Sequence, residues 1–232
     1  MRPFQALRMR KPAAAGGSDP YFSSTVLLLG GEGANNSTTF TDESAAARGN
    51  ATVVSGAKVS TAQFKYGAAA ILLNGSSDYL SYPDSTDFEF GAGQYTVECF
   101  AYFTSVADGC FFGKRDSAGA GWRFGRFSGA LQFVGGTIGI SWTPTVNTWY
   151  HVCADRDAAG ATRVYVDGTM LQKATGVGAI TANSNTFALG RNPASGVFFF
   201  PGYIDEVRIT KGVARYASDS GYTVPTAAFP RS

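Results

Sequence analysis

Paired carboxylates are the simplest catalytic machinery this chain could carry, because glycoside hydrolysis needs two of them flanking the scissile bond. One strand places both on the same face only with a spacing such as Glu-x-Asp-x-Glu. No such run occurs. Glu98 stands alone among apolar neighbours, and the adjacent Asp205 and Glu206 would point to opposite faces of a regular strand. We expect Glu98, Asp205 and Arg208 to serve polar satisfaction within the sandwich.

Side chains for nucleophilic or metal-assisted catalysis are equally sparse. His151 is the only histidine in the 232 residues, and no Gly-x-Ser-x-Gly elbow precedes a helix. A zinc site would need more histidine and cysteine ligands than this sequence can bring together. We therefore expect no enzymatic activity. A hydrolase of unfamiliar type is the third functional alternative, and substitution of Glu98 would test it.

The aromatic stretch between 121 and 127 has the composition of a glycan site, where exposed rings lie beside guanidinium groups. Alternation puts Trp122, Phe124 and Arg126 on one face and Arg123 and Phe127 on the other. Trp122, Arg123 and Arg126 are the candidate glycan-binding residues. Burial in the core is the alternative for Trp122 and Phe124.

Three consecutive phenylalanines occupy what should be a loop. Successive residues of an extended segment cannot all face one core, so at least one of Phe198, Phe199 and Phe200 should point outward. Phe200 leads into the next strand and is the best candidate for burial. Phe198 and Phe199 are candidates for a protein contact or a sugar platform.

The elements that must position these residues follow from a hydrophobic period of two. Between 149 and 168, two alternating runs flank the polar turn 157–160, which predicts a hairpin with one buried and one wetter face. One face carries Tyr150, Val152 and Ala154, and the other carries His151, Cys153 and Asp155. Asp167-Gly168 supplies the next tight turn.

Further strands are expected along the whole chain, whereas no helix of ten or more residues with a period of 3.6 is expected. The predicted strands cover 25–29, 52–55, 58–60, 69–73, 79–82, 95–103, 109–114, 121–127, 130–134, 137–142, 171–174, 186–191 and 202–210. A short helical turn is expected at 213–216, followed by an extended tail. Many short strands at this spacing predict an all-β protein, a two-sheet antiparallel sandwich.

Composition is consistent with one such domain. Hydrophobic residues make up 44% of the chain and charged residues 16%, enough for a sizeable core. No run of about 18 apolar residues is present, so no membrane partner is expected. The net charge of +2 comes from the first 20 residues, and the near-neutral remainder predicts no nucleic-acid partner. Cys99, Cys110 and Cys153 fall in predicted strands and should be buried, reduced thiols.

Four segments resemble one family, the concanavalin A-like jelly rolls of laminin G-like and pentraxin-like type. They are the hairpin Trp-Tyr-His-Val…Val-Tyr-Val-Asp-Gly of 149–168, the hairpin 72–80, the central strand 95–103 and the closing strand 202–209, in family order. The resemblance implies a jelly roll over 21–232. Asp19-Pro20-Tyr21-Phe22 and Ala214-Arg215-Tyr216 are similar to copies of this domain in structural proteins of tailed phages.

The resemblance also raises the question of calcium, which laminin G-like and pentraxin-like relatives often hold at the sheet rim. No cofactor is expected otherwise. Loop carboxylates are present at Asp78, Asp84, Asp87, Asp108 and Asp116, but they are scattered and form no Asp-x-Asp-x-Asp loop. Capping of backbone amides is the alternative role for an Asp in a turn. Asp78 is the first Ca²⁺ ligand to test.

Residues 1–20 are expected to form a basic, flexible N-terminal arm without a secretory signal. A frayed terminus is one interpretation. The other is an anchor that orders on an acidic partner surface. The anchor residues would be Arg2, Phe4, Leu7, Arg8, Arg10 and Lys11.

Three functional hypotheses follow. The first is a non-enzymatic structural or decoration protein of a phage virion, assembled in the host cytoplasm, which displays the jelly roll on capsid or tail. Its arm and Phe198–Phe199 would contact other virion proteins, and a homo-oligomer is an open alternative. The second is a carbohydrate-binding adhesion module that contacts a cell-surface glycan. The third is the hydrolase.

Overall fold

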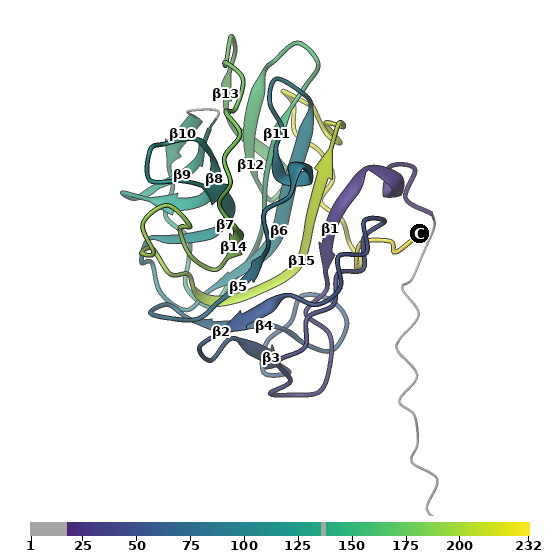
Figure 1. The fold of residues 1–232 in the computed structure, drawn as a ribbon, viewed down its shortest axis with the longest axis vertical. Helices are drawn as coiled ribbons and strands as arrows, with labels where there is room; N and C mark the ends of the chain where they lie inside the picture. Colours follow the sequence, from purple (N-terminus) through teal and green to yellow (C-terminus); the bar gives the residue numbers. More distant parts are fainter. Residues whose placement is uncertain (1–17, 136–137) are drawn as a thin grey trace, which may run out of the picture.

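The computed structural model describes residues 18–135 and 138–232. Its strands form two antiparallel sheets packed face to face (Figure 1). The all-β, two-sheet prediction is therefore confirmed. Two single-turn 3-10 helices, η1 (Phe22–Ser24) and η2 (Thr86–Phe88), are the helical elements among the described residues. None of the described helices is long and apolar enough to cross a membrane.

The eight-stranded sheet has the order β13-β12-β11-β6-β15-β4-β3, and β1 pairs with β15 beside this path. Its strands are β1 (Thr25–Leu29), β3 (Lys58–Ser60), β4 (Ala70–Asn74), β6 (Tyr95–Phe103), β11 (Trp149–Arg156), β12 (Thr162–Val166), β13 (Thr169–Ala174) and β15 (Pro201–Lys211). Strands β6 and β15 form its centre, because β15 pairs with β1, β4 and β6.

The seven-stranded sheet has the order β10-β9-β8-β7-β14-β5-β2. Its strands are β2 (Thr52–Val54), β5 (Tyr79–Tyr82), β7 (Gly109–Arg115), β8 (Gly121–Phe127), β9 (Ala130–Val134), β10 (Ile138–Ser141) and β14 (Phe187–Leu189). Six of the predicted strand ranges are reproduced to the residue, and the others shift at one or both ends by one or two residues.

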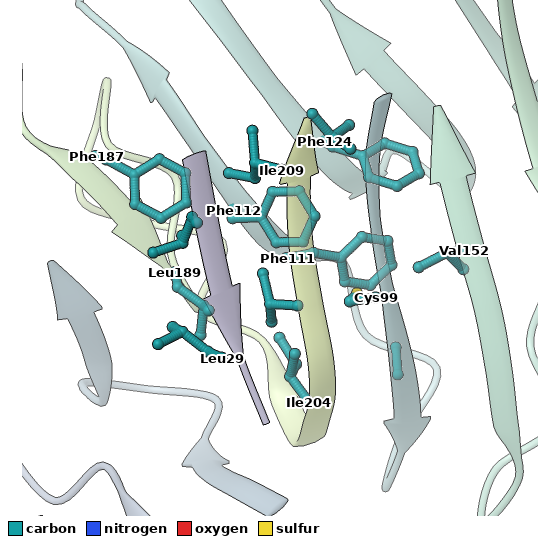
Figure 2. Packing of buried hydrophobic residues seen from close by; sticks show 14 of the residues in the cluster. Leu29, Cys99, Phe111, Phe112, Phe124, Val152, Phe187, Leu189, Ile204 and Ile209 are labelled. Atoms are coloured by element: carbon teal, nitrogen blue, oxygen red, sulfur yellow. The ribbon is translucent and has the colours of Figure 1, made fainter. Parts of the chain in front are cut away.

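The core lies between the two sheets and is built by the alternation of each strand. Val97, Cys99 and Ala101 of β6 face Phe112 and Phe124 of the opposite sheet in one continuous apolar cluster. Figure 2 shows side chains of this cluster from both sheets, among them Cys99 and Phe124, pointing into the space between the sheets. Cys99 belongs to this cluster, and Cys110 and Cys153 are also buried and unpaired, as predicted.

The tight turns predicted from dipeptides are also present. Asp167 and Gly168 both have positive φ, 47° and 75°, which suits a two-residue hairpin between right-twisted strands. At the hairpin before β5, the Asn74 side-chain oxygen accepts hydrogen bonds from the amides of Ser76, Ser77 and Asp78. These turns set the register of the strands that they connect.

The prediction that one face of the 149–168 hairpin is exposed to water is wrong. Val152 and Ala154 belong to the core, as predicted, but His151, Cys153 and Asp155 on the other face are also fully buried. The chain after β15 lies over this outer face of the eight-stranded sheet, where Phe229 packs against Phe100. The segment 213–216, predicted as a helical turn, is irregular in this covering layer.

The prediction that Asp205 and Glu206 point to opposite faces is wrong. Opposite β6, Asp205 pairs with Phe100 and Arg208 with Glu98, so β15 contains one extra residue between them. Glu206 occupies this β-bulge with φ +49°. Both carboxylates therefore reach the covered outer face, where Asp205 accepts from backbone amides of the 61–68 loop and Glu206 binds Arg231.

The two ends of the described chain meet at one place. The Asp19 amide donates to the Ser232 carbonyl over 2.8 Å. The Asp19 carboxylate accepts two hydrogen bonds from Arg215, at 2.9 and 2.8 Å. The arm was predicted to extend to residue 20. Asp19 is buried, however, and therefore belongs to the folded domain. The segments 19–22 and 214–216 thus contact each other directly.

Candidate functional site

The outer face of the seven-stranded sheet carries the candidate site. Its floor is a row of three small residues, Ser81, Ala188 and Gly113, which are paired in register across β5, β14 and β7. Arg123 of β8 pairs with Gly113 and continues the row. A Cβ on Gly113 would lie 2.6 Å from the Trp122 carbonyl, so only glycine fits there. Chain neighbours of these residues point into the core, which leaves the small side chains on the outside.

Aromatic side chains flank this row of small residues on both sides. Phe198 packs edge-on against Phe127 at a centroid distance of 5.4 Å, and Phe199 lies 6.4 Å from Tyr79. Phe127 and Tyr79 come from β8 and β5, which are separated by β7 and β14. The loop 190–200 carries the other two rings across this gap.

A guanidinium group lies over the ring on each side. Arg123 stacks on Phe127 at 4.2 Å and reaches Phe198 at 5.9 Å, while Arg191 stacks on Tyr79 at 4.0 Å. We call this surface the aromatic patch. It consists of Tyr79, Arg123, Phe127, Arg191, Phe198 and Phe199.

The loop that carries Phe198 is held by backbone hydrogen bonds. The Phe198 carbonyl accepts from the Cys110 amide at 2.8 Å, and the Phe200 amide donates to the Gly190 carbonyl at 2.8 Å. Phe200 is fully buried, as predicted. Phe198 has φ +57°, a conformation uncommon for a bulky residue, and its side chain is 36% exposed. The backbone contacts thus hold an aromatic side chain at the surface.

Among the predicted glycan-binding residues, Trp122 is a correction. It is 1% exposed and belongs to the core cluster, where its ring stacks on Phe90. Its indole N–H donates to the Phe88 carbonyl at 2.7 Å. The alternation that puts Trp122 and Phe124 on one face is right, but that face is the core. Trp122 therefore cannot present its ring to a sugar.

Arg126 is also a correction. Its guanidinium is buried and donates to the carbonyls of Trp142 and Val106 at 3.0 and 2.6 Å, and to Asp108 at 2.8 Å. Through these contacts, Arg126 connects the chain at 106–108 with the chain at Trp142. Arg123, Phe198 and Phe199 are the predicted site residues that the structure brings together. Whether they bind a ligand stays a prediction.

Asp78, the residue predicted as the first Ca²⁺ ligand, caps backbone amides. It is buried, and its Oδ1 accepts from the Gly56 amide at 2.8 Å and from the Ser77 hydroxyl at 3.3 Å. Within the part of the chain that the structure describes, no three histidine, cysteine or acidic side chains gather into a group that could hold a metal ion. The anchor residues Arg2, Phe4, Leu7, Arg8, Arg10 and Lys11 lie outside the described residues.

Glu98, the lone carboxylate of the central strand, is fully buried on the covered face. It accepts hydrogen bonds from Arg208 Nε at 2.8 Å, the Tyr216 hydroxyl at 2.7 Å and His151 Nε2 at 3.1 Å. Burial raises the pKa of Glu98, but the charge of Arg208 and the hydrogen bond from His151 outweigh it and hold the pKa below its usual value. The carboxylate is thus saturated by protein donors, consistent with the expected role of polar satisfaction.

Three members of the aromatic patch were not singled out from the sequence. For Phe127, the sequence offers one indication of this site: strand alternation places it on the same face as Arg123. Arg191 lies two residues after the end of β14, at the start of the loop that carries the three phenylalanines, and Tyr79 precedes a core leucine in β5. Their contact joins residues 112 positions apart (191 − 79). No local pattern indicates such a pair.

The two antiparallel sheets define a jelly-roll sandwich of the lectin type. A laminin G-type family model, described as the concanavalin A-like lectin/glucanases superfamily, matches residues 74–216, more than half of the chain. The chain belongs to this superfamily, as the resemblance implied. No curated protein sequence matches it.

Solved structures share the fold at low sequence identity. The binding domain of Paraclostridial Mosquitocidal Protein 1 matches 84% of this chain with a TM-score of 0.62 and 14% identity. The receptor binding domain of botulinum neurotoxin D matches 84% with a TM-score of 0.55 and 15% identity. This chain spans about half the length of these two toxin domains, 50% and 51%.

A third similar structure corresponds to almost a whole chain. It is domain 4 of AbnA, a GH43 extracellular arabinanase from Geobacillus stearothermophilus, in complex with arabinotriose. It matches 82% of this chain and 93% of its own, with a TM-score of 0.58 and 19% identity. At these identities the comparison establishes the common fold and no more.

Proposed function

We propose that this domain is a non-enzymatic recognition module that binds a glycan through the aromatic patch. The observation that carries the proposal is the exposed ring of Phe198, which is held at the surface beside Phe127 and the guanidinium of Arg123. Aromatic faces with adjacent hydrogen-bond donors are what sugar rings require, because a sugar has both apolar C–H faces and polar hydroxyls.

The location of the patch supports a displayed module. The two ends of the described chain lie on the outer side of the eight-stranded sheet, at the right of Figure 1, where Asp19 contacts Ser232. The patch lies on the outer face of the other sheet, formed by β5, β7, β8 and β14. A domain attached to a larger body near its ends would therefore direct the patch away from the attachment.

The absence of enzymatic activity is part of the proposal. Glycoside hydrolysis needs two carboxyl groups beside the bound sugar. Among the described residues, the patch contains aromatic and cationic side chains and no acid. The membership of the chain in a superfamily that includes both lectins and glucanases is compatible with a module that only binds.

A glycan-binding screen with the full-length protein, with and without a calcium chelator, tests this function. The variant Phe198→Ala should weaken binding by about tenfold or more, because it removes the exposed ring. Phe64→Ala is the matched control, since Phe64 is also an exposed phenylalanine, at 43%, on a different loop. The proposal fails if no glycan binds or if both variants behave alike. Loss of binding on chelation would add a Ca²⁺ site.

We further propose that the module belongs to a phage virion, as a structural or decoration protein on capsid or tail. One observation favours this setting: the two segments that resemble phage proteins, 19–22 and 214–216, join through the Asp19–Arg215 ion pair. The arm before them would contact other virion proteins.

Reversing the charge of the arm in the full-length protein, with Arg8→Glu and Arg10→Glu, tests the virion setting. Docking to particles should be lost, because the arm would then repel an acidic surface. Glycan binding should be retained, because the patch is unchanged. Docking that survives the charge reversal would argue against the anchor.

A further inference from the structure

Two arginines of the aromatic patch differ from the other arginines in the described residues. Ten arginines lie in this part of the chain, and eight of them donate a guanidinium hydrogen bond to a protein acceptor. Arg123 and Arg191 are the remaining two. Their Nε atoms are shielded from solvent and have no hydrogen-bond partner among the described residues.

The environment of Arg123 makes its charge costly. Its side chain is half-buried between Phe127 and Phe198. This burial, together with the nearby charge of Arg115, lowers the pKa of Arg123. A guanidinium group nevertheless stays protonated in proteins. The folded protein thus keeps a partly desolvated positive charge without a counterion on the patch.

The carboxylates next to the patch in sequence do not supply this counterion. Asp78 binds the Gly56 amide. Asp108 binds Arg126 and accepts from the Ser128 amide at 2.6 Å. No described acidic side chain forms an ion pair with Arg123 or Arg191. Both guanidinium groups thus have donors available for an external acceptor.

We propose that the aromatic patch binds an acidic polysaccharide, with Arg123 and Arg191 each pairing with an anionic group on a different sugar unit. This inference rests on the proposed glycan-binding function and adds the charge and the repeat of the ligand. A guanidinium group binds a carboxylate or a sulfate through two parallel N–H groups, which gives both charge and orientation. The exposed ring of Phe198, beside Arg123, packs against the sugar.

The spacing of the two arginines requires more than one charged unit. Arg191 lies over Tyr79 of β5 and Arg123 over Phe127 of β8, and two strands separate β5 from β8. With neighbouring strands about 4.8 Å apart, the axes of β5 and β8 are about 14 Å apart. The rings under the two guanidinium groups therefore belong to strands about 14 Å apart, a span that a polymer with repeated charges can bridge. Occupying both sites raises the affinity beyond that of either one.

The test compares polymers that share a backbone and differ in charge. Dextran sulfate is paired with dextran, and polygalacturonate with its methyl ester, each titrated against the full-length protein. We expect the charged member of at least one pair to bind about a hundredfold more tightly than its neutral counterpart, and than free galacturonate or inorganic sulfate. The pair that responds distinguishes a sulfate from a carboxylate ligand.

Variants locate the binding. Arg123→Met and Arg191→Met should each lower the affinity for the acidic polymer about tenfold or more. Lys173→Met is the charge-matched control, since Lys173 lies on β13 of the other sheet, and it should change the affinity less than about twofold. Thermal unfolding of each variant confirms that it is folded.

The outcomes separate the two levels of the proposal. Equal binding of charged and neutral polymers, or unchanged affinity in both arginine variants, overturns the acidic ligand and leaves the glycan function intact. Equal inhibition by inorganic sulfate and by the polymer at the same anion concentration would show a simple anion site and also overturn it. Silence toward every polymer, charged or neutral, removes the glycan function itself.

Discussion

The two outer faces of the sandwich differ in whether their charged side chains are paired within the protein. On the eight-stranded sheet, the segment after β15 covers a network in which each buried carboxylate has a protein donor. On the seven-stranded sheet, Arg123 and Arg191 stack on rings and donate to no protein acceptor among the described residues. The carboxylates of the first face are thus bound by the protein itself, with Asp205 Oδ1 as an exception, whereas the second face leaves two guanidinium groups without a protein acceptor.

The covered face shows how a saturated network is built. Glu98 accepts from Arg208, His151 and Tyr216. Because the ionised carboxylate can only accept, His151 Nε2 carries the proton in this contact, and a neutral His151 accepts the Tyr222 hydroxyl at Nδ1 over 2.9 Å. The Tyr216 and Tyr222 rings stack with centroids 3.6 Å apart.

The comparison shows that the energetic cost of an unpaired charge depends on how deeply its side chain is buried. A fully buried charge without a partner would cost several kcal/mol, so such charges are paired in a stable fold. A half-buried guanidinium can remain unpaired at lower cost because part of it reaches water. Unpaired guanidinium groups are therefore informative about ligands mainly where part of the side chain reaches water, as for the half-buried Arg123 and Arg191.

The largest expected effect comes from removing one cation of the covered network. Arg208→Met leaves the buried Glu98 without its ion-pair partner and should lower the free energy of unfolding by about 3–5 kcal/mol. Arg191→Met on the patch should change it by less than about 0.5 kcal/mol. Urea denaturation at neutral pH measures both. Similar losses in the two variants would contradict the contrast between the faces.

The covering segment itself provides the next effect. Phe229 is 1% exposed and packs on Phe100 and under the Arg208 guanidinium, at 3.7 Å from its ring centroid. Phe229→Ala should cost about 3 kcal/mol, since it leaves a cavity over the sheet. Phe198→Ala, at the exposed patch, should cost less than about 1 kcal/mol and weaken glycan binding instead. The idea fails if Phe198→Ala is the more destabilising change.

The pH dependence of stability should come from the covered face. Burial raises the pKa of Asp205 to about 8, against about 4 in the unfolded chain. Between these values the folded state holds more protons, so stability falls as the pH rises, by up to about 1.4 kcal/mol per pH unit. Burial also raises the pKa of Asp155, to about 6, so its contribution to this decline ends near pH 6.

Asp205→Asn isolates this effect, because the amide imitates the protonated carboxyl and keeps an acceptor for the amides of Lys65 and Tyr66. The decline in stability between about pH 6 and pH 8 should become flatter in this variant. Chemical denaturation across this range measures the slope. A slope as steep as that of the wild type would rule out Asp205 as its source.

The smallest effect is expected at an exposed ion pair on the edge strand β13, at the margin of the covered face. Lys173 Nζ lies 2.6 Å from the carboxylate of Asp219, whose side chain is 54% exposed. Lys173→Ala should leave the free energy of unfolding nearly unchanged, because water and salt screen the pair. Thermal melts at low and high salt should differ little between variant and wild type. A large, salt-dependent loss would show that the edge strand depends on this pair.

Part of the candidate site follows from sequence alone. Three consecutive phenylalanines cannot share one core, which correctly indicated an outward ring at Phe198 and a buried Phe200. Alternation correctly placed Arg123 and Phe127 on one face of β8. Tyr79 and Arg191 were missed because their stacking depends on the pairing of β5 with β14, which no local pattern specifies.

Local physics accounts for what the sequence determined by itself. Period-two alternation specified the strands and the two faces of each, and Asn74-Gly75 and Asp167-Gly168 specified tight turns because they tolerate the required backbone angles. These features need only a few neighbouring residues, so they are visible without the fold.

The tertiary structure alone decided what lies over each face. Alternation separates His151 from Val152 but does not say that the segment after β15 covers His151, or that Trp122 faces the core rather than solvent. Asp19 and Arg215 meet across 196 residues, and Arg191 meets Tyr79 across strands. Such contacts depend on the packing of distant segments, and this packing leaves one outer face closed and the other with two arginines available to a ligand.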